Sequence, residues 1–240
     1  MRTAVVWAVL RDALTALAVD RGETSLHVLD AGGGTGGFAV PLAELGHQVT
    51  VVDPSPDSLA ALERRAAEAG ISGAVHAVQG DVAQLPDLAA PDGVDVVLCH
   101  SVLEVVDDPA AAAAAVARVL RPGGIASVLA AGRGAAVIAR ALAGHFDEAA
   151  QVLADEHGRF GPADALVRRF TEPELVALLA DAGLRVDSVH AVRVFSDLVP
   201  GALLDDPTAG EALLALEAAV AERPEFRALA TQLHVLALRP

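Results

Sequence analysis

A cluster of glycines near the start of the sequence has the residue type and spacing of a nucleotide-binding turn. Gly32, Gly34 and Gly37 match the pattern G-x-G-x-x-G directly after a short apolar segment. Glycines let a backbone approach a ligand closely, and the N-terminus of the following helix favours negative charge. Asp53 stands about 20 residues further on, where an acid can accept hydrogen bonds from ribose hydroxyls. A tight turn without a ligand is the alternative, but the glycines, Asp53 and the preceding strand pattern together favour ligand binding.

Two further acidic residues favour a cationic, adenosine-containing ligand over a dinucleotide. Asp30 immediately precedes the glycine-rich segment, where its carboxylate would repel a pyrophosphate but attract a sulfonium and an amino group. Asp81 follows another apolar segment, and an adenine amino group could donate a hydrogen bond to it. Asp81 fits equally well as the N-cap of a turn that starts at Val82. The glycine pattern taken literally also permits a nicotinamide-dependent oxidoreductase.

The elements that must position these residues alternate between strand and helix patterns. Period-2 or continuous apolar runs predict strands at 25–30, 47–52, 74–78, 94–100, 125–130, 184–194 and 232–238. Helical spacing predicts helices at 3–19, 57–69, 108–120 and 208–222, with others ending at Leu45 and beginning after Thr171. The Arg-Pro-Gly-Gly segment at 121–124 is expected to be a turn. Strands separated by helices predict right-handed βαβ units on a parallel sheet.

The motif series resembles that of the class I S-adenosylmethionine (SAM) dependent methyltransferases. It consists of Val28–Gly36, Asp53, Gly80–Asp81 and Leu120–Gly124. Within that superfamily the chain is most similar to the tRNA 5-carboxymethoxyuridine methyltransferase group. The segments that carry this likeness are Ala31–Gly34, Gly46–Val49, Cys99–Val106, Gly144–Asp147, Val192–Phe195, His234–Val235 and Arg239–Pro240.

The resemblance implies an α/β, Rossmann-like fold: a mostly parallel seven-stranded sheet with an antiparallel last strand and helices on both faces. We expect residues 1–240 to form a single methyltransferase domain. Its parts would be an N-terminal helix at 3–19, a SAM-binding core at 25–130, a candidate lid at 134–170 and substrate-side elements at 171–240. The 134–170 stretch is expected to be the least regular.

The motifs and the resemblance together give a set of cofactor-binding residues, with SAM bound and S-adenosylhomocysteine (SAH) released. They are Arg2, Asp30, Gly32, Gly33, Gly34, Asp53, Gly80, Asp81, Val82 and His100. The resemblance implies that the glycines pack against the methionine part, Asp53 holds the ribose, and Asp81 with the adjoining backbone reads adenine. It places His100 beside the methyl donor. From the residues alone, His100 is an ordinary polar strand end and Arg2 a terminal charge.

For the acceptor, the resemblance implies a carboxylate on a modified tRNA wobble uridine, and a small acidic metabolite is the alternative. The residues to test near the acceptor are Arg133, His145, Arg193 and His234. An arginine fork can hold a carboxylate in two parallel hydrogen bonds, although surface ion pairs with the abundant acids explain such arginines equally simply. An ionised carboxylate needs no general base, so no catalytic acid–base pair is predicted. For a phenol or amine acceptor, His100 or His145 would be the candidate base.

The composition narrows the remaining function classes. The 240 residues include 17 basic residues, all arginine, and 32 acidic ones, which gives a net charge of −15 and disfavours DNA or other non-specific nucleic-acid binding. The single cysteine, Cys99, excludes a disulfide framework and a multi-cysteine metal site; we predict that it is a core residue and that no metal is bound. Arginines interrupt the apolar stretches, so a cytoplasmic protein without a membrane span is expected. A SAM-binding partner subunit without catalysis is the third function class.

Overall fold

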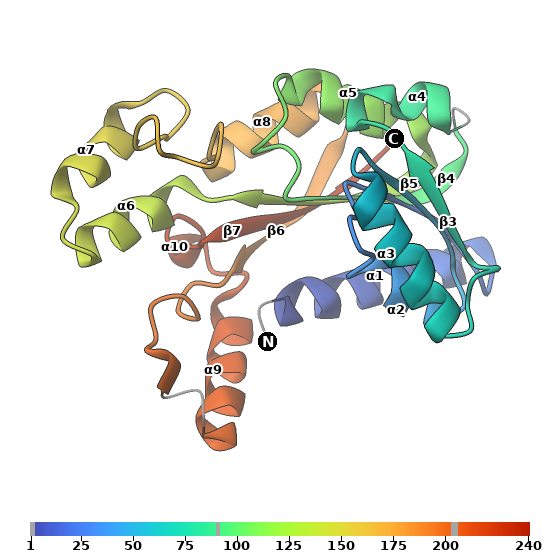
Figure 1. Ribbon diagram of the computed structural model, residues 1–240, viewed down its shortest axis with the longest axis horizontal. Coiled ribbons are helices and arrows are strands. Elements are labelled where there is room, and N and C mark those ends of the chain that lie inside the picture. Colours follow the sequence, from blue (N-terminus) through green and yellow to red (C-terminus); the bar gives the residue numbers. More distant parts are fainter. Residues whose placement is uncertain (1–2, 90–91, 203–205) are drawn as a thin grey trace.

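A seven-stranded sheet forms the centre of the computed structural model, which describes residues 3–89, 92–202 and 206–240 (Figure 1). The strands are β1 (His27–Ala31), β2 (Gln48–Asp53), β3 (Val75–Gln79), β4 (Val94–His100), β5 (Leu120–Ala131), β6 (Arg185–Val192) and β7 (Gln232–Leu238). Their order is β3-β2-β1-β4-β5-β7-β6. The pairings among β1 to β5 are parallel, whereas β7 runs antiparallel to β5 and β6. The predicted mostly parallel sheet with an antiparallel last strand is therefore confirmed.

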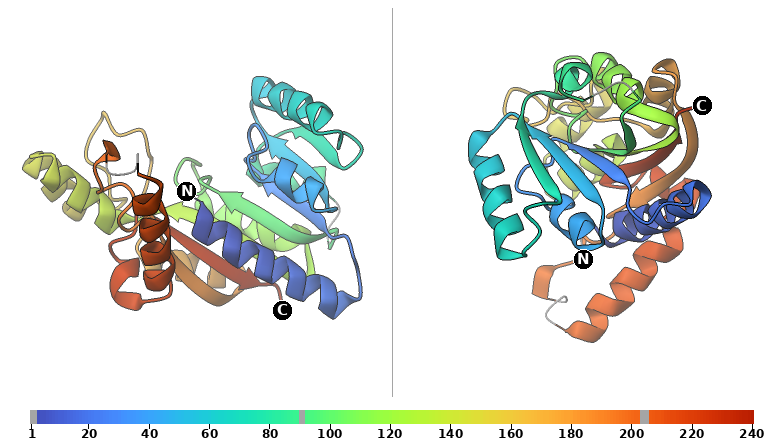
Figure 2. Two further views of the ribbon diagram at one scale, coloured as in Figure 1. Left: turned by 90° about the horizontal axis from the view of Figure 1, so that it is seen from below. Right: turned by 90° about the vertical axis from the view of Figure 1, so that its right-hand side faces the viewer.

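Helices cover both faces of this sheet (Figures 1 and 2). They are α1 (Ala4–Arg21), α2 (Ala39–Glu44), α3 (Pro56–Glu68), the 3-10 turn η1 (Val82–Gln84), α4 (Leu85–Leu88), α5 (Pro109–Val119), α6 (Arg133–Leu142), α7 (Phe146–Ala154), α8 (Glu172–Asp181), α9 (Pro207–Val220) and α10 (Pro224–Arg227). Leu10 of α1 and Leu62 of α3 belong to one buried cluster, and Leu85 of α4 and Leu175 of α8 belong to another. None of the helices in the described ranges is long and apolar enough to cross a membrane.

Several helices begin where a capping residue is followed by proline, which explains why their starts can be read from the sequence. Ser55 accepts a hydrogen bond from a backbone N–H of the first turn of α3, and Pro56 opens that helix. Asp108 caps two N–H groups of α5, and Pro109 follows it. Thr171 forms a capping box at the start of α8. Each cap satisfies backbone donors that the helix itself cannot satisfy.

The expected turn at 121–124 is wrong, because those residues lie within β5. The strand begins at Leu120 rather than at residue 125. Val94 of β4 pairs with Leu120, whereas Val96 pairs with Ile125, so the register shifts between the two pairs. The Arg-Pro-Gly-Gly segment therefore bulges out of the strand instead of ending it. The other predicted strands and helices agree with the structure to within two residues at each end.

The stretch from 134 to 170 is more regular than the sequence suggests. It contains most of α6 and all of α7, which form a helical hairpin extending from the carboxyl end of β5 (Figure 1). Residues 155–170 then return to the sheet without a helix or strand of their own. The hairpin escapes prediction because its helices are short and two glycines, at 134 and 144, interrupt the pattern. The short elements η1, α4 and α10 also lack a periodic signal.

Asp95, a fully buried carboxylate of β4, holds the amino-terminal edge of the sheet together, and its loss should lower the stability of the fold. It accepts hydrogen bonds from the side chains of Arg21 and Arg121 and from the His27 backbone N–H. We expect Asp95→Ala to lower the free energy of unfolding by about 3 kcal/mol, since hydrogen bonds to a charged group are lost and a backbone N–H is left unpaired. Urea unfolding measures the effect. Asp187→Ala, on the exposed side of β6, is the control, and equal midpoints for the two variants would contradict the assignment.

Candidate active site

A cavity of about 630 Å³ lies where the carboxyl ends of β1, β2, β3 and β4 meet. This is a volume in which proteins hold cofactor-sized ligands, and the edge of the sheet at which open α/β folds bind them. Five of the predicted cofactor residues line it: Gly32, Asp53, Gly80, Asp81 and Val82. The structure therefore brings together residues that are far apart in the sequence.

Two glycines of the turn after β1 are required by close packing rather than by the turn alone. A Cβ atom on Gly32 would lie 2.5 Å from a methyl group of Val102, and the residue has a φ of +72°. A Cβ atom on Gly33 would lie 2.5 Å from the Asp30 carboxyl and 2.9 Å from Val51. Any side chain at either position would collide with these groups. The turn thus keeps its backbone close to the floor of the cavity.

The Asp53 carboxylate is held in place by two loops. The Gly34 N–H donates to Oδ2 and the Ser55 N–H donates to Oδ1, each at 2.9 Å. Each carboxylate oxygen can accept more than one hydrogen bond, so both retain acceptor capacity for a ligand. Because Asp53 also lines the cavity, it can accept hydrogen bonds from two neighbouring hydroxyl groups.

Asp81 is an N-cap, as one of the two interpretations of the sequence predicts, and it also borders the cavity. Its carboxylate accepts a hydrogen bond from the Ala83 N–H at 3.0 Å, and Gln84 completes a capping box, so Asp81 is the N-cap of η1. It lines the cavity at the same time. Capping orients the side chain, which makes an acid on this loop a fixed acceptor rather than a mobile one.

Asp30 lies beneath the glycine turn and is almost fully buried. Burial, reinforced by the nearby Asp53 carboxylate, raises the pKa of Asp30 to about 7. The carboxyl is therefore close to half-protonated at neutral pH when no cation is near it. A positively charged ligand group placed beside it would favour the ionised form.

His100 is a predicted cofactor residue that does not line the first cavity. Arg2 lies outside the described residues. His100 ends β4, and its ring packs edge-on against Phe38 with centroids 4.6 Å apart. Burial lowers the pKa of His100 to about 3, so the ring is neutral at pH 7 and is a poor general base there. The residue next to it, Ser101, lines the cavity.

Ser101 and Glu104 are site residues that the sequence analysis missed. Ser101 has a φ of +58°, an unusual value for serine, and its hydroxyl accepts a hydrogen bond from Gln232 Nε2 at 3.0 Å. Glu104 is buried, and burial raises its pKa to about 7 against the opposing effect of hydrogen bonds, including those from Ser101 and the Ala131 backbone. No sequence signal predicts a positive φ at a serine. The proximity of Ser101, Glu104 and Gln232 is therefore seen only in the folded structure.

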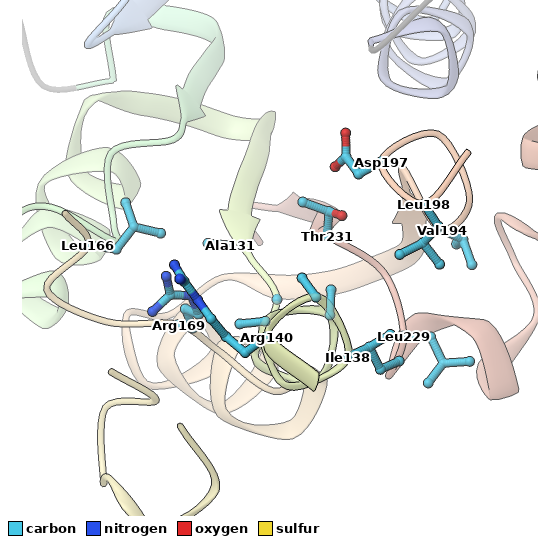
Figure 3. Close-up of a pocket in the computed structure, with 14 residues that line it drawn as sticks. Ala131, Ile138, Arg140, Leu166, Arg169, Val194, Asp197, Leu198, Leu229 and Thr231 are labelled. Atoms are coloured by element: carbon cyan, nitrogen blue, oxygen red, sulfur yellow. The ribbon is translucent and has the colours of Figure 1, made fainter. Parts of the chain in front are cut away.

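A second cavity, of about 250 Å³, lies between α6, the 155–170 segment and the connection from β6 to β7 (Figure 3). Arg140 and Arg169 approach it together from one side. Thr231 also lines it, one residue before Gln232, which bonds to Ser101 of the first cavity. Two neighbouring residues where β7 begins therefore contact one cavity each: Thr231 lines the second, and Gln232 bonds to a residue of the first. The apolar part of the wall includes Ile138, Val194 and Leu198.

The two arginines of the second cavity differ in how many of their N–H donors already form hydrogen bonds within the protein. The Arg169 guanidinium forms two hydrogen bonds to Asp164, at 2.5 and 3.0 Å. Arg140 forms one bond of 3.0 Å to Glu148, and its guanidinium carbon lies 3.6 Å from the centre of the Phe160 ring. Since a guanidinium carries five N–H donors, Arg140 keeps donors that a ligand could use.

The four residues predicted near the acceptor do not line the second cavity. Arg133 bonds to Glu174 at 3.0 Å, and Arg193 bonds to Asp197 at 2.5 Å. The ion-pair interpretation therefore describes both arginines in this structure. His145 precedes α7 and is more than half exposed, whereas His234 is fully buried within the sheet.

Cys99 lies in the buried strand β4, one residue before His100. Burial raises the pKa of its thiol to about 12, so the thiol stays protonated and unreactive at neutral pH. The prediction that Cys99 is a core residue is therefore confirmed.

The arginines in the carboxyl-terminal half of the chain are mostly neutralised by neighbouring acids. Arg168 instead donates to three backbone carbonyls of the segment after β4. Paired arginines attract phosphate groups less strongly than unpaired ones. The ion pairs of the arginines in this half, among the described residues, are Arg121–Asp95, Arg133–Glu174, Arg140–Glu148, Arg159–Asp155, Arg169–Asp164, Arg193–Asp197, Arg223–Glu225, Arg227–Glu172 and Arg239–Asp92.

Comparisons with known proteins agree with this geometry. Residues 29–128 match the methyltransferase domain family. The whole chain is 32% identical to the tRNA 5-carboxymethoxyuridine methyltransferase of Escherichia coli (strain K12), covering 88% of that protein. A SAM-dependent methyltransferase from Methanosarcina mazei has a similar structure, with a TM-score of 0.63 and 18% identity over 92% of this chain and 96% of that one. So does the magnesium protoporphyrin IX methyltransferase of Synechocystis PCC 6803, solved with bound SAH, with a TM-score of 0.61 and 18% identity over 95% of this chain and 81% of that one.

Proposed function

The chain belongs to the class I SAM-dependent methyltransferases, and we propose that it methylates a carboxylate, that of a modified uridine at the wobble position of tRNA. The observation that carries this proposal is the full-length likeness to the E. coli enzyme. That likeness extends beyond the cofactor half of the chain to α6, the 155–170 segment and the β6–β7 connection, which line the second cavity. Those elements would contact the acceptor. Sequence similarity in them is therefore better evidence for a shared acceptor than similarity in the cofactor motifs, which methyltransferases with different acceptors also have.

In this proposal, the first cavity holds SAM through the residues that line it. Asp53 accepts hydrogen bonds from the ribose hydroxyls, and Asp81 with the backbone of Gly80 and Val82 contacts adenine. The glycine turn would contact the methionine part, and the Asp30 carboxylate, buried beneath the turn, would attract the cationic end of the ligand. His100 and Arg2 complete the set on the strength of the family resemblance.

The reaction needs positioning rather than proton transfer. SAM supplies a methyl group on a sulfonium, and transfer to a carboxylate oxygen forms a C–O bond, breaks the C–S bond and leaves SAH with a neutral sulfur. The acceptor is already ionised at pH 7, so no residue has to remove a proton. A neutral His100 is consistent with this chemistry, since its low pKa makes it a weak base. What the protein contributes is an aligned, water-poor site in which opposite charges neutralise one another.

The Arg140 side of the second cavity is the candidate position for the acceptor carboxylate. Arg140 has unused donors, and the apolar wall of the cavity can contact the uncharged part of an acceptor. Gln232, which follows Thr231 of this cavity, donates a hydrogen bond to Ser101 of the first cavity. The acceptor and the methyl donor would therefore lie on adjoining sides of the start of β7. The arrangement suits an organic anion with an apolar body.

A small acidic metabolite is the second candidate acceptor, and the charge of the protein favours it. The net charge of −15 repels a tRNA backbone, and nine arginines in the described part of the carboxyl-terminal half are ion-paired. A small acid would need only the local donors of Arg140 and would not depend on a basic surface.

Transfer of labelled methyl from SAM distinguishes these candidates. The protein is incubated with total tRNA or with a small-metabolite extract from the source cells, and Asp53→Ala serves as the control for transfer by the enzyme itself. Label in tRNA that mild alkali releases would support the wobble-uridine carboxylate, because esters are cleaved under these conditions. Label that resists alkali would contradict a carboxylate acceptor. Label only in the metabolite fraction would support the second candidate, and label in neither would indicate a non-catalytic SAM-binding subunit.

The raised pKa of Asp30 predicts how SAM binding depends on pH. Below about pH 7 the free protein holds a proton on Asp30, and binding a cation beside it must release that proton. SAM affinity should therefore rise as the pH increases toward 7, by up to about tenfold per pH unit, and level off above pH 7. Calorimetry in buffers of different ionisation enthalpy measures the released proton.

Asp30→Asn is the matched variant for this prediction, because it keeps the shape of the side chain but cannot titrate. Its SAM affinity should be nearly constant over the same range. The comparison separates Asp30 from Glu104, which burial also brings to a pKa of about 7. Equal slopes in the wild type and in Asp30→Asn would assign the pH dependence to another group.

A further inference from the structure

A row of polar side chains, fully buried in β5 and β7 and half-buried at the end of β4, crosses the sheet next to Ser101 of the first cavity. His100 of β4, Ser127 of β5 and His234 of β7 lie on three consecutive strands and point to the same face. His100 Nε2 is 2.9 Å from Ser127 Oγ, and Ser127 Oγ is 2.8 Å from His234 Nε2. Ser127 and His234 are fully buried.

Buried polar groups of this kind are costly in a core made mainly of alanine, valine and leucine. The hydrogen bonds reduce the cost of Ser127 but do not remove it for the rings, because Nδ1 of both histidines is buried without a partner in the described residues. Stability alone does not account for the row. Apolar residues at positions 127 and 234 would suit the packing, since three of their cross-strand neighbours on the same face are buried and apolar: Leu98, Leu129 and Leu236.

The three groups restrict one another's protonation. Burial lowers the pKa of His100 and of His234, so both rings are neutral at pH 7 and each carries one proton. Ser127 has a single hydroxyl proton and stands between two Nε2 atoms. It can donate to one ring only, and the other ring must then donate to it. The two histidines are therefore forced into opposite tautomers.

We propose that Ser127 and His234 are positioning residues that form a relay with His100 and fix its tautomer, with the His100 proton on Nδ1. In this state Ser127 donates to His100 Nε2 and accepts from His234 Nε2–H. The N–H without a protein partner then lies on His100, at the strand end next to Ser101, which lines the first cavity. Nδ1 of both rings is buried, but His234 is fully buried inside the sheet whereas His100 is half-buried at a strand end, so an N–H without a partner is less costly on His100.

The environment around the relay supports a fixed ring rather than a mobile one. The Phe38 ring packs edge-on against His100, and Trp7 of α1 stacks on Phe38 with centroids 4.7 Å apart. At the other end, the His190 ring lies 5.7 Å from that of His234. Because His100 Nδ1 is covered and His100 does not line the first cavity, a ring held in one orientation would act on that cavity through the adjoining residue Ser101, which does line it.

The tautomers can be measured directly in the intact protein. Long-range ¹⁵N–¹H correlation spectra at pH 7.5 distinguish the two neutral forms of each histidine. We expect His100 in the Nδ1–H form and His234 in the Nε2–H form. His76, which is exposed on β3, should show averaged signals and serves as the internal reference. Identical tautomers at His100 and His234, or an Nε2–H form at His100, would overturn the proposal.

Substitution of Ser127 tests whether the relay matters to the site. Ser127→Ala should remove the fixed pair of tautomers and weaken SAH binding by about three- to tenfold, the effect of one hydrogen bond. Ser127→Thr keeps the hydroxyl and should restore both to about the wild-type values. Ser188→Ala, on the next strand but one, is the control and should change neither. Unchanged SAH affinity in a folded Ser127→Ala protein would overturn the role of Ser127.

This experiment does not depend on the acceptor, because the tautomers and SAH binding are both measured without one. If Ser127→Ala fails to fold, the wild-type spectra and Ser127→Thr still decide the question. Failure of the labelling experiment described above would leave the relay untouched, and identical tautomers would leave the proposed acceptor untouched.

Discussion

Replacing Asp53 by alanine should weaken SAH binding by at least about a hundredfold. Its carboxylate would accept hydrogen bonds from two ribose hydroxyls, and hydrogen bonds to a charged group contribute about 1.5–3 kcal/mol each. Two such bonds correspond to about two or more powers of ten in affinity. The substitution also frees the Gly34 and Ser55 N–H groups, so the loops that shape the cavity lose their common anchor. Both effects act in the same direction, and calorimetric titration with SAH measures their sum.

Asp53→Asn separates the two contributions. An asparagine side chain can still accept from one of the two loop N–H groups, so it preserves part of the anchor while it removes the charge. Its SAH affinity should fall between those of the wild type and Asp53→Ala. Asp57→Ala, which removes an exposed acid from the first turn of α3, should bind SAH normally. An Asp53→Ala affinity within about threefold of the wild type would show that the ribose does not lie here.

That Gly32, Asp53 and Asp81 would meet at the first cavity could be predicted because their determinants are local. A glycine turn after a strand, an acid at the end of the next strand and an N-capping acid on a third each leave a short sequence signature. The parallel sheet then brings these strand ends to one edge without further information. This is why Gly32, Asp53 and Asp81 meet at one cavity although 49 positions separate the first from the last.

The acceptor half could not be predicted in the same way, because its geometry depends on tertiary packing. Arg133 and Arg193 had the residue type for holding a carboxylate, but the fold places an acid beside each of them. Arg140 has no distinguishing sequence signal, yet it borders the second cavity with donors to spare. The acid beside Arg133 is Glu174 of α8, 41 positions away, and no pattern in the sequence predicts that the two residues meet.

The contact between Ser127 and His234 could not be predicted from the sequence for a different reason. Ser127 and His234 are 107 positions apart, and each stands in an apolar strand in which a single polar residue has no evident purpose. Their contact follows from the order β4-β5-β7, in which the last strand inserts beside β5 in an antiparallel direction. The antiparallel last strand was predicted, but its register against β5 was not, and the register decides which side chains meet.

Replacing Arg140 by alanine should raise the KM for a carboxylate acceptor by about ten- to a hundredfold and leave SAH binding unchanged. The loss corresponds to one charge-assisted hydrogen-bonding contact in a partly buried cavity. Initial rates with tRNA that carries 5-carboxymethoxyuridine measure it. Arg140→Lys keeps the charge but not the planar fork and should give an intermediate value. Arg159→Ala, which removes an exposed arginine paired with Asp155, is the control for a general loss of positive charge.

The methyl ester product makes this prediction specific for the carboxylate. Methylation removes the negative charge, so the ester should bind the wild type and Arg140→Ala with similar affinity, whereas the free acid should discriminate between them. A variant that weakened both ligands equally would have lost cavity shape, because Arg140 also packs over Phe160. A variant that weakened neither would place the acceptor carboxylate elsewhere, and the second cavity would then bind only the uncharged part of the acceptor. The charge of the acceptor, rather than its size, is therefore the property that the paired comparison measures.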